Sequence, residues 1–278
     1  MAGKQSHIYD VIVIGAGVSG IGAGIRLLKD GFENFLILEK ANDLGGTWRD
    51  NTYPGCECDV PSALYSYSFA QKPDWSRTFA GHAEILQYVR NTAEHFGVME
   101  YIRYQQPVEK AQWNEAKGYW EIRTPKERYC ARTMVACSGY LHEPIIPAIP
   151  GIERFPGKVF HSSRWDHDYD LRNRRVAVIG TGASAIQFVP EIQPKVKQLA
   201  IFQRTPQWVL PKPNRGLSRL EKGLFALKPL LGAWRQMLFG GFESFGVGFR
   251  RPAVLRQLQR LGELHLRLTV KDKALRKK

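Results

Sequence analysis

The sequence predicts an α/β fold with two Rossmann-like dinucleotide-binding domains and a helical C-terminal segment. Three observations support this prediction. Glycine-rich loops occupy residues 15–20 and 180–185, each directly after a short apolar run, and residues 211–278 are strongly basic. A strand, a glycine-rich loop and a helix in succession form a cradle for a dinucleotide pyrophosphate. Two such cradles on one chain indicate two dinucleotides, an arrangement that suits electron transfer between them.

The first predicted unit is a strand at residues 9–14 followed by the loop G-A-G-V-S-G. Gly15 allows the tight turn out of the strand, Gly17 lets the pyrophosphate approach the backbone, and Gly20 lets the helix pack on its strand. The phosphates would lie on unpaired N–H groups at the positive end of the helix dipole. This loop therefore predicts the first dinucleotide site.

A second buried strand is predicted at residues 35–38, and Glu39 lies at its end, 19 residues after Gly20. A carboxylate at this position can accept hydrogen bonds from both ribose hydroxyls of an adenosine and would repel a 2′-phosphate. The first site is therefore expected to bind FAD or NAD rather than NADP. The alternative is a solvated glutamate at a strand end.

The second predicted unit begins with a strand at residues 176–179 and the loop G-T-G-A-S-A, in which Ala185 replaces the third glycine. The next predicted strand, residues 199–202, is followed by Arg204 and Thr205 and by no acidic residue. A planar guanidinium beside a hydroxyl suits a phosphate group. The second site is therefore expected to prefer NADPH, and the alternative is a surface arginine without a ligand.

Composition favours an intracellular α/β enzyme. A chain of 278 residues can bury one large core or two modest cores. The sequence has no stretch of about 18 apolar residues that would predict a spanning helix, and residues 1–10 lack the apolar region of a signal peptide. The four cysteines lack zinc-type spacing, so we expect no metal site, reduced thiols and a cytoplasmic location.

The basic character of the chain is concentrated near its C-terminal end. Residues 211–278 contain sixteen Lys and Arg and four Asp and Glu, which gives a net charge of +12 out of +14 for the whole chain. No aromatic and basic RNA-binding motif accompanies this charge. We therefore expect no nucleic-acid partner.

Two longer patterns lie between the glycine-rich loops. Residues 46–59 match G-x-W-x-x-x-x-[FY]-P-G-x-x-x-D at every fixed position, and residues 155–166 match F-x-G-x-x-x-H-x-x-x-W-[PD] likewise. Both resemble the fingerprints of the Baeyer–Villiger monooxygenases, which belong to the class B flavoprotein monooxygenases. From about residue 8 to residue 210, the order of motifs is similar to the order in that family.

The resemblance implies a role for each motif residue. Asp59 would be the catalytic residue, lying near the flavin ring and orienting an arginine, although no arginine of this chain matches the one in the family. FAD would be bound by Gly15, Gly17, Gly20, Glu39, Gly46, Thr47, Trp48, Asp59, Tyr65 and the backbone of Val108. NADPH would be bound by Gly180, Thr181, Gly182, Ser184, Gln187, Arg204 and Thr205. A linker that the family uses for domain movement would contain Phe155, Gly157, His161, Trp165 and Asp166.

Simpler interpretations stay open for three of these residues. Asp59 could be an ordinary turn or cap residue after Cys58. His161 could be a core histidine with satisfied hydrogen bonds, and Trp165 could simply pack. Cys56 and Cys58 occupy unrestricted positions of the first fingerprint, so neither is assigned a role.

The resemblance implies an enzyme that uses FAD and NADPH to insert one oxygen atom from dioxygen into a ketone substrate. The alternatives are an N- or S-oxygenating flavin monooxygenase and a non-catalytic nucleotide-binding fragment. Members of the family continue well past 278 residues. We therefore expect a truncated or split enzyme whose activity as this polypeptide alone is weak or absent.

The motifs divide the chain into three predicted segments. Residues 1–147 would form the FAD-binding domain, residues 148–210 the first part of the NADPH-binding domain with the linker, and residues 211–278 a basic helical segment. Leucines and arginines at helical spacing predict an amphipathic helix over residues 254–268. This helix either lies between the domains near the substrate, as the resemblance implies, or makes a peripheral membrane contact.

Overall fold

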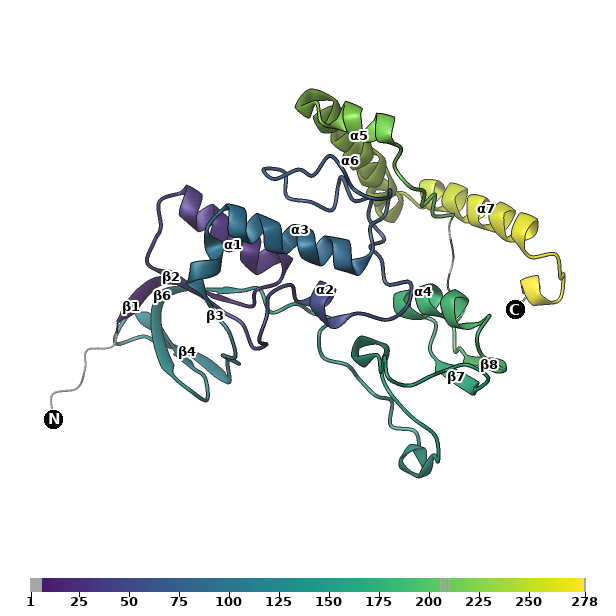
Figure 1. Cartoon of the computed structure of the whole chain (residues 1–278), viewed down its shortest axis with the longest axis horizontal. Helices are drawn as coiled ribbons and strands as arrows, with labels where there is room; N and C mark the ends of the chain where they lie inside the picture. The colour runs from purple at the N-terminus through teal and green to yellow at the C-terminus, as the bar shows by residue number, and fades with distance from the viewer. Residues whose placement is uncertain (1–6, 206, 208, 210, 278) are drawn as a thin grey trace. The chain divides into compact units, whose positions relative to one another are not determined.

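The apolar runs predicted as strands form parallel sheets with helices beside them, so the predicted α/β class is confirmed (Figure 1). The structure is a computed structural model. It describes residues 7–205, 207, 209 and 211–277, with the backbone alone at residues 245, 249, 252, 258 and 277. The elements in chain order are β1 (Ile8–Ile14), α1 (Val18–Lys29), β2 (Phe35–Leu38), α2 (Thr47–Asp50), α3 (His82–His95), η1 (Val98–Tyr101), β3 (Ile102–Arg103), β4 (Lys110–Asn114), β5 (Tyr119–Arg123), β6 (Arg128–Ala136), η2 (Ile152–Arg154), η3 (Ser162–Arg164), β7 (Arg175–Ile179), α4 (Ala183–Ile192), β8 (Gln198–Phe202), α5 (Arg219–Phe225), α6 (Lys228–Arg250), α7 (Pro252–Thr269) and η4 (Leu275–Lys277).

Contacts divide the chain into two units. Unit 1 consists of Met1–Tyr53 and His82–Asp166, and unit 2 consists of Pro54–Gly81 and His167–Lys278. The segment Pro54–Gly81 therefore belongs with the second half of the chain, although it follows the first nucleotide loop in sequence. The boundaries at residues 147 and 210 mark changes of motif and stay a prediction.

Unit 1 is built on a six-stranded sheet with the strand order β3-β2-β1-β6-β5-β4. The central strand β1 pairs in parallel with β2 and with β6, while β4 and β5 extend the sheet in antiparallel fashion. Ile12, Leu36, Leu38 and Ile122 form part of a buried core cluster on this sheet. Because strands covered on both faces must be apolar throughout, β2 consists of four buried hydrophobic residues.

Unit 2 contains one β-α-β unit followed by helices. The strands β7 and β8 pair in parallel from Arg175 with Gln198 to Ile179 with Phe202, and α4 connects them. Helix α5 begins with a capping box in which the Ser218 hydroxyl and the Glu221 carboxylate bond to each other's backbone N–H groups. This reciprocal cap fixes where the helical segment starts.

The two long helices of unit 2 lie within the predicted helical segment at residues 211–278. Helix α7 covers the predicted amphipathic stretch at residues 254–268. Helix α6 continues through the glycine-interrupted apolar stretch at residues 239–249, although each interior glycine costs a helix about 0.5–1 kcal/mol relative to alanine. No helix in the described part of the chain is long and apolar enough to cross a membrane.

Candidate nucleotide-binding sites

The first glycine-rich loop has the steric features of a phosphate cradle. Gly15 has φ +99°, and a Cβ atom there would lie 2.6 Å from the Cys137 carbonyl oxygen. A Cβ atom on Gly20 would lie 1.8 Å from the Gly15 carbonyl oxygen. On Gly17, in contrast, a Cβ atom would make an ordinary contact of 3.8 Å with the Cα atom of Gly46. Gly15 and Gly20 therefore serve internal packing of the loop, whereas Gly17 faces the segment that contains Gly46.

The amide groups at the start of α1 suit an anion. The N-cap residue Gly17 provides no side-chain hydrogen bond, and the first turn of α1 carries no acidic residue. The helix dipole favours negative charge at this end. The positive end of the helix dipole and a first turn without an acidic side chain together fit a pyrophosphate group.

The first fingerprint begins directly beside this loop. Gly46 has φ +53°, and a Cβ atom there would lie 3.2 Å from the Cα atom of Gly17. The Gly45 N–H donates to the Ala16 carbonyl at 2.9 Å, which joins the two segments. At the start of α2, Thr47 is exposed and Trp48 is buried. Unit 1 thus brings Gly46, Thr47 and Trp48 to the phosphate loop, as the resemblance implies.

Glu39 is buried, with 4% of its surface exposed, and each of its carboxylate oxygens accepts a hydrogen bond from a backbone N–H group. Its Oε2 atom accepts the Ala16 N–H at 2.8 Å, and Oε1 accepts the Ala41 N–H at 2.9 Å and Arg49 Nη1 at 3.1 Å. A carboxylate has about four lone-pair positions, so about one acceptor position is left for a ribose hydroxyl. Glu39 is therefore no solvated strand-end residue.

Arg49 contacts Glu39, and the sequence did not reveal this contact because Arg49 occupies an unrestricted position of the first fingerprint. It makes ion pairs with Asp50 at 2.8 Å and with Glu39 at 3.1 Å. Burial opposes its charge, but the hydrogen bonds and charges of Asp50 and Glu39 outweigh burial and raise the pKa of Arg49 above its ordinary value. Arg49 thereby holds the Glu39 side chain in place.

The segment after β3 runs beside Glu39 and contains Tyr104 and Val108. The Gln106 N–H donates to the Glu39 carbonyl at 2.9 Å. The Tyr104 hydroxyl is buried and has no hydrogen-bond partner among the described residues, and burial followed by the charge of Asp43 raises its pKa. Val108 is half-buried, and its backbone N–H and C=O make no hydrogen bond within the described residues. These unsatisfied groups fit the adenosine end of a dinucleotide, and nothing in the sequence marked Tyr104.

The second glycine-rich loop is open at both of its glycines. Gly180 has φ +104°, and a Cβ atom on Gly180 or Gly182 would meet nothing within 4 Å. Gly182 caps α4 without a side-chain hydrogen bond, and the first turn of α4 has no acidic residue. Thr181 and Ser184 are half-buried, and their hydroxyls make no hydrogen bond with another described residue. This loop also fits a pyrophosphate group.

Arg204 and Thr205 lie beyond the end of β8, at the edge of the sheet where the second loop begins. The Gly180 N–H donates to the Phe202 carbonyl at 2.9 Å, which places the ends of β7 and β8 side by side. Both Arg204 and Thr205 are exposed. Within the described residues Arg204 makes no ion pair or hydrogen bond. Its guanidinium is therefore available to an anionic group.

Gln187 makes contacts that the sequence did not predict. Its Nε2 atom donates to the Glu57 carbonyl at 3.0 Å and to Asp59 Oδ1 at 3.1 Å, and its Oε1 atom accepts the Glu57 N–H at 3.3 Å. A role in binding the NADPH pyrophosphate would require the amide to give up these bonds. In unit 2, Gln187 instead joins α4 to the second half of the first fingerprint.

Lys212 contacts the first fingerprint, which the sequence did not reveal because Lys212 lies in the basic segment far along the chain. Its Nζ atom lies 2.7 Å from Glu57 Oε1 and 3.0 Å from Asp59 Oδ1. Asn214 Nδ2 donates to Glu57 Oε2 at 2.5 Å. The Asp59 carboxylate, 62% exposed, is thus held by a lysine, so Asp59 is more than an ordinary turn residue.

Asp59 and Tyr65 belong to unit 2, whereas the first nucleotide loop belongs to unit 1. Tyr65 lies in a turn in which its N–H donates to the Pro61 carbonyl at 2.8 Å. The approach of both side chains to a flavin stays a prediction. Of the nearby cysteines, Cys58 is buried, and burial raises the pKa of its thiol to about 11, which makes it a poor nucleophile.

The second fingerprint forms local contacts within unit 1. The Ser163 N–H donates to His161 Nδ1 at 3.1 Å, so His161 caps the short helix η3 and its neutral ring carries the proton on Nε2. Trp165 packs edge-on against Phe160 with ring centroids 5.3 Å apart, and Asp166 pairs with Lys158 at 2.7 Å. Phe155 is exposed, and a Cβ atom on Gly157 would lie 2.5 Å from the Phe155 ring. These contacts give the pattern a structural role, and its part in domain movement stays a prediction.

Several known proteins are similar to this chain in sequence and in structure. A Baeyer–Villiger monooxygenase of Streptomyces coelicolor is 46% identical over 96% of this chain and 52% of its own length. The crystal structure of OTEMO in complex with FAD and NADP matches 80% of this chain and 44% of that protein, with a TM-score of 0.74 and 35% identity. The closed crystal structure of cyclohexanone monooxygenase matches 80% of this chain and 43% of that protein, with a TM-score of 0.74 and 33% identity. The chain spans about half the length of the relatives it matches.

The family assignment covers both nucleotide loops and both fingerprints. Residues 9–216 match the family described as "Flavin-binding monooxygenase-like". This range begins in β1 and ends just beyond the Lys212 and Asn214 contacts. The chain therefore belongs to the flavin-binding monooxygenase-like family.

Proposed function

We propose that the chain binds FAD in unit 1 and NADPH in unit 2, and that it acts in the NADPH-dependent insertion of one oxygen atom from dioxygen into a ketone. Support comes from the relative named a Baeyer–Villiger monooxygenase, from the likeness to cyclohexanone monooxygenase and from the likeness to a protein crystallised with FAD and NADP. Because the chain covers about half of these proteins, the whole activity is part of the proposal.

One observation carries the proposal: the two strand ends beyond the two loops have opposite chemistry. At the end of β2, the buried carboxylate of Glu39 has room for a ribose hydroxyl and would repel a phosphate. Beyond β8, the exposed Arg204 has no partner among the described residues and attracts a phosphate. The chain thus offers one site that suits an adenosine with a free ribose and another that suits an adenosine with a 2′-phosphate.

The residues of this chain would bind and orient, while the flavin would supply the redox and oxygen chemistry when bound. Gly17 and the start of α1 would hold one pyrophosphate, and Gly182 and the start of α4 the other. Arg204 would select the nicotinamide dinucleotide that carries a 2′-phosphate. Asp59, held by Lys212, would present a fixed carboxylate beside the flavin.

Nucleotide titrations test this proposal. We expect the purified chain to bind FAD and to prefer NADPH over NADH. Arg204→Gln should weaken NADPH binding about tenfold or more and leave NADH binding unchanged, because it removes charged hydrogen bonds to the phosphate. Arg172→Gln is the matched control, since Arg172 is exposed and already paired with Asp170 at 2.9 Å. Equal affinity of the unmodified chain for NADPH and NADH would contradict the proposal.

An oxygen-uptake assay tests the proposed reaction itself. Cyclohexanone, an amine and a sulfide are supplied in turn with NADPH and FAD, to the chain alone and to the chain mixed with a polypeptide corresponding to the remaining half of a relative. The likeness to cyclohexanone monooxygenase favours ketone oxidation over N- or S-oxygenation. Uptake that responds only to the amine or the sulfide would contradict this choice.

For the basic helices, the sequence suggested two roles, which are packing between the domains and a peripheral membrane contact. Exposed leucines of α7, among them Leu261, Leu264 and Leu268, lie on the same helix as exposed arginines. A peripheral membrane contact requires binding to anionic vesicles that high salt reverses. Sedimentation with such vesicles at low and at high salt distinguishes this contact from a helix that packs only against protein.

A further inference from the structure

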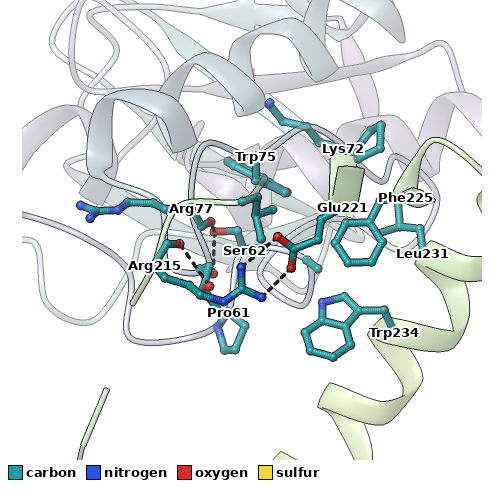
Figure 2. A pocket seen from close by; sticks show the side chains of 14 residues that line it. Pro61, Ser62, Lys72, Trp75, Arg77, Arg215, Glu221, Phe225, Leu231 and Trp234 are labelled. Atoms are coloured by element: carbon teal, nitrogen blue, oxygen red, sulfur yellow. Dashed lines mark hydrogen bonds and ion pairs between the residues drawn. The ribbon is translucent and has the colours of Figure 1, made fainter. Parts of the chain in front are cut away.

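Unit 2 contains a cavity of about 160 Å³ that none of the nucleotide-loop residues lines (Figure 2). Its walls come from the segment at residues 61–78, from residues 215–217 and from helices α5 and α6. All of these parts belong to unit 2. The cavity is therefore a feature of this unit by itself.

The cavity walls are mainly aromatic and aliphatic. Trp75 is 1% exposed and Leu231 is 4% exposed, so both form fixed walls. Phe225 and Trp234 face each other with ring centroids 6.0 Å apart and ring planes 22° apart. Three aromatic rings around one space favour a planar or cyclic hydrocarbon group, because rings pack in offset or edge-on contact with such groups.

Two of the three cationic side chains that line the cavity, Lys72 and Arg215, form ion pairs, and the third is Arg77. The Arg215 guanidinium forms two bonds with the Glu221 carboxylate, at 2.9 and 2.5 Å, as the dashed lines in Figure 2 show. Lys72 pairs with Asp74 at 2.8 Å. Arg77 points away from the aromatic side chains (Figure 2). An ionised ligand among the aromatic rings would lose its hydration without an unpaired counter-charge beside it, so this part of the cavity suits an uncharged molecule.

Several hydrogen bonds hold the walls together without a ligand. Arg235 Nη1 on α6 donates to the Ala63 carbonyl at 2.6 Å and to the Leu64 carbonyl at 3.0 Å. The Leu217 N–H donates to the Ser76 carbonyl at 3.0 Å. These bonds join the segments that form the walls, so ligand binding would require little additional ordering of the protein.

We propose that this cavity is a binding site for one small uncharged molecule that carries a single six-membered ring. An apolar cavity of roughly 150 Å³ is known to accommodate benzene, whereas sites for drug-sized ligands reach about 300–1,000 Å³. The volume here therefore matches one ring and excludes a nucleotide. This site is additional to the nucleotide sites, and it does not depend on the proposed oxygenation.

Ligand titration without any nucleotide tests the proposal on the full chain. Phenol and cyclohexanone serve as uncharged single-ring probes, benzoate as a charged probe of similar shape and 1-naphthol as a two-ring probe, with binding followed by saturation-transfer NMR and tryptophan fluorescence. We expect saturable binding of both single-ring probes with a Kd of about 1 mM, a usual value for ligands of this size. Benzoate and 1-naphthol should bind at least about tenfold more weakly.

A cavity-filling substitution locates the binding. Ala63→Phe places a ring in the cavity and should abolish phenol binding, while Ala233→Phe, at an exposed position of α6 that does not line the cavity, should leave it unchanged. Leu231→Ala enlarges the cavity and should raise 1-naphthol affinity about tenfold. Circular dichroism verifies that each variant is folded. Should Ala63→Phe not fold, the 1-naphthol affinity of Leu231→Ala decides the test. The absence of saturable phenol binding, or equal binding by Ala63→Phe and Ala233→Phe, overturns the proposal. FAD and NADPH titrations of the same samples show separately whether the nucleotide sites are intact.

Discussion

Glu39 connects the integrity of unit 1 with its proposed ligand. Its carboxylate accepts two backbone N–H groups and the Arg49 guanidinium inside the protein. These three donors pair with the negative charge of the carboxylate. The same charge would discriminate between a ribose and a 2′-phosphate. At this residue, nucleotide selection and folding stability cannot be varied independently.

Glu39→Gln should therefore reduce both properties. The amide keeps the side-chain shape but loses the charge that pairs with Arg49, and an NH₂ group faces backbone donors. We expect the free energy of unfolding to fall by about 1–3 kcal/mol and FAD affinity to fall about tenfold. Urea denaturation and FAD fluorescence measure the two effects. Glu33→Gln, at an exposed position before β2, is the control and should change neither. Unchanged stability of Glu39→Gln would show that the internal contacts are unimportant.

Glycines distinguish the elements that bind from the elements that pack. Gly182, at the start of α4, has φ −70° and an open side where a Cβ atom would meet nothing within 4 Å. Gly55, in the first fingerprint, has φ +75°, and a Cβ atom there would lie 2.8 Å from the Gln187 carbonyl oxygen on α4. The first position leaves room for a ligand, and the second lets the fingerprint segment approach the helix backbone.

Alanine substitutions should separate these two roles. Gly182→Ala should leave the unfolding midpoint unchanged or slightly raised, because Ala tolerates this backbone conformation, and should weaken NADPH binding. Gly55→Ala should lower the free energy of unfolding by about 1–3 kcal/mol, because a positive φ and a backbone clash combine. Thermal melts and NADPH titration test both variants. Equal NADPH affinity in Gly182→Ala and the unmodified chain would refute the assigned role of the loop.

The start of helix α5 should weaken at low pH. The hydrogen bond from Arg215, followed by those from Ser218, lowers the pKa of Glu221 to about 2 from an ordinary value of about 4.3. Because the folded-state pKa is the lower one, this stabilisation is complete above about pH 5 and is lost progressively as the pH falls from there through 2. The difference in thermal midpoint between the unmodified chain and Glu221→Gln should therefore be constant from pH 7 to pH 5 and shrink below pH 4. A difference that stays constant to pH 2.5 would contradict the ion pair.

The whole molecule combines a large positive charge with exposed apolar side chains. The net charge is +14, and in unit 2 Phe202 is 60% and Leu268 is 72% exposed. In the described part of the chain, β7 and β8 pair only with each other, so each also presents an open edge. Charge repulsion keeps copies apart at low salt, whereas apolar surface and open strand edges favour association.

Self-association should accordingly increase with salt. Raising the ionic strength from about 0.01 M to about 1 M shortens the Debye length from about 30 Å to about 3 Å and removes the repulsion. Light scattering should show a mass that rises with salt and with protein concentration. Phe202→Lys and Leu268→Lys should reduce this rise, and Glu33→Lys should change it little. A constant monomer mass over this range would show that the exposed apolar side chains do not drive association.

The sequence by itself determined four of the strands, both glycine-rich loops and the family. The strand predictions at residues 9–14, 35–38, 176–179 and 199–202 are confirmed by β1, β2, β7 and β8, because a short apolar run bounded by polar or glycine-rich residues is a local signal. The position of Glu39 at the end of β2 was also predictable, since one helix and one turn set the distance from the glycine-rich loop to the next strand end.

Only the tertiary structure decided what surrounds these motifs. The segment Pro54–Gly81 joins unit 2, where Lys212 reaches Glu57 across 155 residues of sequence. Arg49 and Tyr104 both lie near Glu39, although no sequence pattern marks either residue. The cavity beside Trp75 and Trp234 combines segments that are far apart in sequence. Local patterns record the backbone geometry of one element, whereas these side-chain contacts depend on which distant elements pack together.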